Sequence, residues 1–182
     1  MAFDLGNLLN QYLGGAAGGS PHQANDDFDR VAQNAPPDVL ARGVTGALRS
    51  DQTPPFAQMV SQIFGQSNPN QRAGMLNQLL ATLGPVVLAQ LASGRSGGQG
   101  GLGGLASIFG GGRAPAQVTP EQASQVSPEE VRELAERAEQ QNPSIVDRMG
   151  DFYAQNPTLV KAIGGAALAI ALGHMAQNMR RQ

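Results

Sequence analysis

The sequence predicts an all-α fold of two small helical blocks joined by a glycine-rich segment, with no sheet. Apolar residues recur at the three-four spacing of helices along most of the chain, and no stretch alternates with the period of two typical of strands. The 24 glycines and 12 prolines among 182 residues divide this pattern into short helices. We therefore expect an N-terminal arm at 1–21, helical blocks at 22–93 and 119–182, and a linker at 94–118.

The arm begins with an amphipathic helix over residues 3–13. A helix this short is not stable in isolation, so it must pack on something. We expect it to pack on its own domain or to act as a docking arm for a partner or an interface. Its apolar positions fit the helical template throughout: Leu5, Leu8, Leu9, Tyr12 and Leu13.

The first block is predicted to contain helices over 38–49, 56–64, 69–82 and 86–92, preceded by one that ends at Asn34. Asp26 or Asp27 is expected to cap that first helix, and Asn68 followed by Pro69 is a typical helix start. Each helix has one apolar stripe, which is enough to build a small bundle.

The glycine-rich segment has ten glycines between Gly94 and Gly112, too many for a stable helix. Its composition is typical of a flexible linker. The alternative is that packing, including packing between subunits, holds it. The apolar anchors would then be Leu102, Leu105, Ile108 and Phe109.

The second block has the clearest helix signals. Thr119 and Ser127 each precede a proline and have Gln122 or Glu130 three residues later, which is the capping-box pattern. Gln-Asn-Pro occurs at 141–143 and again at 155–157, and each proline disfavours helix at the residue before it. These positions predict sharp bends between consecutive helices.

The last predicted helix, over 157–179, is the most apolar part of the chain, with Lys161 as the only charge from Leu159 to Met175. Gly165, Ala169 and Gly173 recur every four residues and therefore share one helix face. Small residues at this spacing allow another helix to approach closely. We expect these three residues to form a helix-packing interface between subunits, with packing within one subunit as the alternative.

Charge and composition exclude several classes of protein. The net charge is −2, and Arg180–Arg181 is the only basic cluster, which argues against nucleic acid as a partner. The chain has no cysteine, so disulfides and thiolate chemistry are excluded. The N-terminal stretch has an acid at Asp4 and no basic residue, unlike a secretory signal. We expect a cytoplasmic protein, or alternatively one associated with the inner membrane.

No motif for catalysis or cofactor binding is present: there is no phosphate loop, nucleophile elbow or metalloprotease motif. His22 is expected in a loop, and His174 is expected to be a packed or interface residue. Helix caps and solvated acids explain the cluster from Asp26 to Asp29 better than a cation site does. We therefore predict a protein that is not an enzyme and has no cofactor, metal or small-molecule substrate.

Several segments carry a family resemblance. GMLNQLLATLG from residue 74, the later GGLASIFGGG and the N-terminal FDLGNLLNQYLGG resemble the YidB-like group of uncharacterised bacterial proteins. VDRMGDFYAQNPTLVKAIGGAALAIALG resembles the tail of longer uncharacterised bacterial relatives. The resemblance implies an all-helical bacterial protein and supplies no catalytic residue.

The pattern favours a non-enzymatic structural protein that assembles with copies of itself through its C-terminal helix. The alternative is a membrane-associated protein that inserts or docks this helix. Its apolar run of about 17 residues is shorter than the roughly 20 that span a bilayer, and it contains Lys161 and His174.

Overall fold

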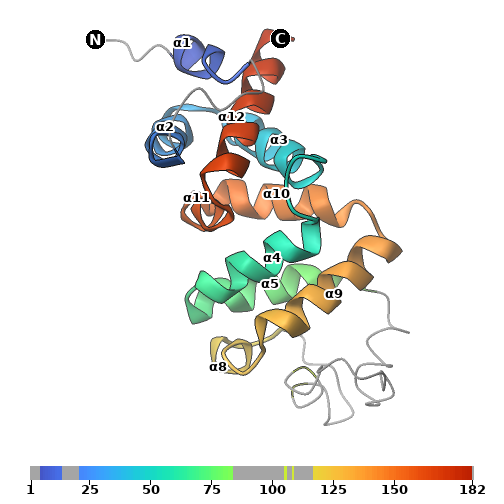
Figure 1. The fold of residues 1–182 in the computed structure, drawn as a ribbon. Coiled ribbons are helices and arrows are strands. Elements are labelled where there is room, and N and C mark those ends of the chain that lie inside the picture. The colour runs from blue at the N-terminus through green and yellow to red at the C-terminus, as the bar shows by residue number, and fades with distance from the viewer. Residues whose placement is uncertain (1–4, 14–20, 84–104, 106–107, 109–116, 182) are drawn as a thin grey trace. The chain divides into compact units, whose positions relative to one another are not determined.

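The computed structural model describes residues 5–13, 21–83, 105, 108 and 117–181. Within these ranges the chain forms ten α-helices and one 3₁₀ helix and no strand, which confirms the all-α prediction (Figure 1). The elements are α1 Leu5–Asn10, α2 Pro21–Asn34, α3 Pro37–Leu48, α4 Phe56–Gln66, α5 Pro69–Thr82, α8 Pro120–Ala123, α9 Pro128–Gln141, α10 Ile145–Gln155, α11 Pro157–Val160, η1 Lys161–Ile163 and α12 Gly165–Arg180.

Polar caps fix three of the helix starts as the sequence predicts. The side chains of Asn68, Thr119 and Ser127 each accept a backbone N–H three residues later. The side chain of that later residue accepts the N–H of the cap in return, so each capping box is complete. Each cap satisfies donors that the first turn of a helix leaves without a partner.

The chain divides into two compact units, the first of which is not continuous in sequence. Unit 1 combines Met1–Pro55 with Val146–Gln182, and unit 2 is Phe56–Ile145. This division differs from the expected blocks at 22–93 and 119–182, because helices from both blocks contribute to each unit. Helical periodicity shows which face of a helix is buried, but it does not show which helix covers that face.

In unit 1, α12 packs chiefly on α3, then on α2, and α1 lies against the later part of α12 (Figure 1). Two glycines of α3 make the contact close. A Cβ on Gly43 would lie 2.2 Å from Met175 Cγ and 2.9 Å from the Ala171 carbonyl oxygen, and one on Gly46 would lie 2.6 Å from His174 Cγ. Side chains at these two positions would push the helices apart.

The expected helix over 157–179 is interrupted, which corrects that prediction. α11 continues into η1, which ends at Ile163. Gly164 follows, and its φ of 90° lies in the region that only glycine adopts readily. α12 then begins at Gly165. The apolar pattern continues across the break, because Leu159, Val160 and Ile163 are buried like the core face of α12.

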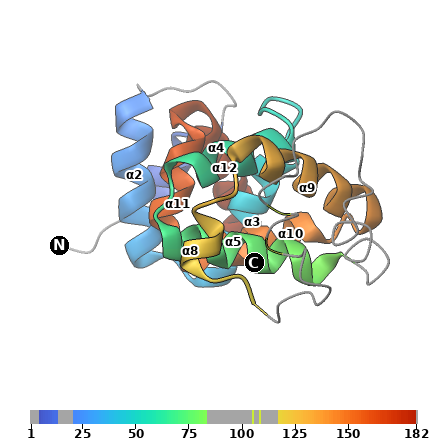
Figure 2. The same cartoon turned by 90° about the horizontal axis from the view of Figure 1, so that it is seen from below.

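In unit 2, α4 packs on α9, and α5 packs on α8 and α9; Figure 2 shows α5 beside α8. Asn77 of α5 holds the chain where it enters α8. Its Oδ1 accepts the Val118 N–H at 2.7 Å, and its Nδ2 donates to the Val118 carbonyl at 3.2 Å. The Arg72 guanidinium caps the end of α4 by donating to the carbonyls of Phe64 and Gly65, both at 2.9 Å.

Other predictions concern residues outside the described ranges. The predicted helix over 86–92 lies there, and so does most of the 94–118 linker. Of its four proposed anchors, Leu105 and Ile108 are described, and both are buried. The Leu105 N–H donates to the buried Glu130 carboxylate at 3.4 Å.

We predict that Gly43→Ala destabilises the protein by about 1–3 kcal/mol, because the new methyl group overpacks the contact with α12. Gly65→Ala is the matched control. Its Cβ would meet only Pro128 Cγ, at 3.5 Å, and the change should stabilise α4 by about 0.4–1 kcal/mol. Denaturant unfolding followed by circular dichroism measures both, and equal midpoints for Gly43→Ala and the parent would contradict the close contact.

Candidate functional site

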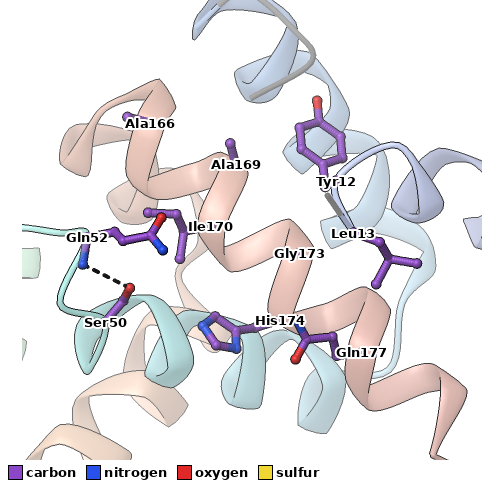
Figure 3. Close-up of a pocket in the computed structure, with 10 residues that line it drawn as sticks. All are labelled: Tyr12, Leu13, Ser50, Gln52, Ala166, Ala169, Ile170, Gly173, His174 and Gln177. Carbon is purple, nitrogen blue, oxygen red and sulfur yellow. Dashed lines mark hydrogen bonds between the residues drawn. The ribbon is translucent and has the colours of Figure 1, made fainter. Parts of the chain in front are cut away.

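A groove within unit 1 runs along α12 and has a volume of about 450 Å³. Figure 3 shows α12 along the groove, with the turn after α1 on one side and the turn after α3 on the other. Ten residues line it: Tyr12, Leu13, Ser50, Gln52, Ala166, Ala169, Ile170, Gly173, His174 and Gln177.

The groove follows a face of α12 that the described residues of unit 1 cover only in part. Ala166 and Gln177 are exposed, and Ile170 and His174 are half-buried. The opposite face, which includes Leu168, packs inside the unit. The groove face therefore has small side chains with one larger apolar group, Ile170, between them.

The three residues predicted as a helix-packing interface occupy different environments. Gly173 is buried, and a Cβ there would lie 3.0 Å from the Tyr12 carbonyl oxygen, so α1 is its close neighbour. Ala169 lines the groove and is 8% exposed. Gly165 is half-buried at the start of α12 and is not part of the groove lining. Packing of these residues between subunits stays a prediction.

Sequence reasoning missed Gly43 and Gly46, the two glycines that allow the close contact between α3 and α12. The sequence contains a pattern that could have indicated them, because two glycines three residues apart lie on the same face of a helix. Val39, Val44 and Leu48 made the apolar stripe of this helix the stronger pattern, and it concealed the glycine pair.

The predicted docking arm packs on its own unit. Leu8, Leu9 and Tyr12 are buried, and Leu5 and Leu13 are half-buried. The Tyr12 hydroxyl donates to Asp27 Oδ2 at 2.7 Å. This buried bond joins the turn after α1 to the middle of α2.

Asp27 therefore has a different role from the expected cap. α2 begins at Pro21 rather than at Asp26 or Asp27, so Asp27 lies inside the helix and is 5% exposed. Arg30 pairs with it at 3.7 Å, one turn later. His22 lies exposed in the first turn of α2 and not in a loop.

The polar groups of the groove take part in structural contacts. Ser50 Oγ accepts the Gln52 N–H at 3.2 Å, as the dashed line in Figure 3 shows. The ring of His174 lies where a side chain on Gly46 would be. In the part of the chain that the structure describes, no three His, Asp or Glu side chains are grouped to hold a metal ion.

No described helix is both long enough and apolar enough to cross a bilayer. This includes α12, on which the membrane alternative depends.

Both tyrosines of the chain lie in unit 1, and both have a raised pKa. Burial raises the pKa of Tyr12, and its hydrogen bond and charge interaction with Asp27 raise that pKa further. Burial alone raises the pKa of Tyr153, whose hydroxyl has no hydrogen-bond partner among the described residues. Both tyrosines are therefore held in the neutral form.

We predict that the protein loses stability above about pH 10, where tyrosine in an unfolded chain ionises. The unfolded chain then releases protons that folded Tyr12 and Tyr153 keep, so the free energy of unfolding falls as the pH rises. Urea unfolding at pH values from about 8 to 11 measures the decline. The double variant Tyr12→Phe/Tyr153→Phe should show a smaller decline, and an unchanged slope would contradict the assignment.

No family model, curated protein or solved structure matches this chain. The resemblance to the YidB-like group therefore stays an expectation from the quoted segments.

Proposed function

We propose that this chain is a non-enzymatic protein that associates with copies of itself through the groove face of α12. The observation that supports the proposal is the composition of this face. It combines small residues, Ala166, Ala169 and Gly173, with the half-buried Ile170 between them.

A second copy of the same face is a suitable partner for such a surface. Two copies related by a two-fold axis present the same surface to each other. Each residue of one copy therefore contacts residues of that same surface on the other copy. The Ile170 side chain of one copy can occupy the shallow space beside Ala166 and Ala169 of the other. Small residues at helical spacing allow the close approach that this packing requires.

Charge also favours a second copy as the partner. None of the ten groove-lining residues is Asp, Glu, Lys or Arg. Two groove faces can therefore meet without like-charge repulsion and without removing an ion from water. An ionic ligand would find no charged partner of opposite sign in the lining.

A non-enzymatic role agrees with how the polar lining residues are used. Ser50 receives a backbone N–H, and the His174 ring fills the space above Gly46. These contacts shape the groove walls.

Docking on a membrane surface is the second candidate, and it depends on the end of α12. Met179 is 36% exposed there, beside the exposed Arg180 and Arg181. An apolar side chain next to two cations suits an anionic bilayer surface. Cosedimentation of the protein with vesicles that contain anionic lipid would support this candidate.

We predict that Ala166→Glu weakens self-association about tenfold or more, because a glutamate fills the shallow space and places a charge in each face. Ala166 is exposed near the start of α12, so the carboxylate also suits the helix dipole and the fold should persist. Sedimentation equilibrium at micromolar concentrations measures the association constant.

Ala81→Glu is the matched control, since Ala81 is an exposed alanine of α5 and lies outside the groove. It should associate like the parent. A parent that stays monomeric, or equal association of both variants, would overturn the proposal. Gly173→Leu would be a poor test, because its side chain would first clash with the Tyr12 carbonyl.

A further inference from the structure

We propose that α1 and the turn after it, residues 5–13, form a releasable strap on α12, and that release of the strap opens the groove face to a second copy. The inference rests on the proposed self-association and adds its regulation. It is drawn from the position of Tyr12, which contacts two other helices at once.

Tyr12 fixes the strap at two points. Its carbonyl oxygen lies over Gly173 of α12, where any side chain would meet it at 3.0 Å. Its hydroxyl donates to the buried Asp27 carboxylate of α2 at 2.7 Å. A single residue therefore joins the strap to both helices beneath it.

The strap covers one end of the face that the proposed function uses. Gly173 continues the series of small groove residues that includes Ala166 and Ala169. Tyr12 and Leu13 form the groove wall beside it (Figure 3). The strap thus covers the C-terminal part of this face and leaves the part around Ala166 open.

The strap can detach from α2 and α12 while the rest of unit 1 stays folded. α1 has six residues, fewer than an isolated helix needs, so it is helical only while it is docked. Its buried contacts come chiefly from Leu8, Leu9 and Tyr12. Elements with few buried contacts open more readily than the core of a protein does.

The hydrogen bond from the Tyr12 hydroxyl to Asp27, called the latch below, holds the strap in its docked position. In the docked state the Asp27 carboxylate is 5% exposed and receives the Tyr12 hydroxyl. Removing this donor leaves a buried carboxylate with less compensation for its lost hydration. Undocking of the strap exposes the carboxylate to water again. A variant without the Tyr12 hydroxyl should therefore shift the equilibrium from the docked to the undocked strap.

The test compares Tyr12→Phe with Tyr153→Phe in the full chain. Tyr12→Phe keeps the aromatic ring but loses the latch, and Tyr153→Phe removes a hydroxyl that has no partner among the described residues. Hydrogen exchange of the amides in residues 5–13 should speed up about tenfold for Tyr12→Phe and stay unchanged for Tyr153→Phe. Self-association should strengthen for Tyr12→Phe alone.

The outcomes separate the strap from the function on which it rests. Unchanged exchange in Tyr12→Phe would overturn the latch. Faster exchange with unchanged association would overturn the regulatory role, while Ala166→Glu still decides self-association independently. Faster exchange together with stronger self-association than in the parent would support the strap.

Discussion

The close approach of α12 to α3 is the contact on which the rest of unit 1 depends. Gly43 and Gly46 leave space for Met175 and His174, so the two helices pack with almost no side-chain spacer on the α3 side. This contact fixes which face of α12 is buried. The faces left for α2, for α1 and for the groove then follow from helical geometry.

Because of this arrangement, the apolar character of the C-terminal helix does not by itself indicate a second copy or a membrane. A helix that is apolar nearly all round must be covered, and its own unit covers most of α12. Among the described residues, the groove face around Ala166 and Ile170 is covered only in part. The case for a second copy therefore rests on this smaller surface, and not on the whole helix.

The sequence predicted the local structure well, because capping and apolar periodicity are local signals. The helix starts after Asn68, Thr119 and Ser127 follow directly from their side chains. Which helices pair could not be predicted, since several similar apolar stripes compete for the same partners. The break at Gly164 was concealed by an uninterrupted apolar pattern, and the bond between Tyr12 and Asp27 joins residues whose proximity only the fold creates.

The division of unit 1 between both ends of the chain has a consequence for synthesis on the ribosome. Residues 56–145 emerge after α3 and before α12, so unit 2 can fold while α3 still lacks its main partner. Until α12 emerges, the glycine face of α3 has no helix packed on it in the nascent chain. Chaperone binding in that interval would protect the very surface that later receives Met175 and His174.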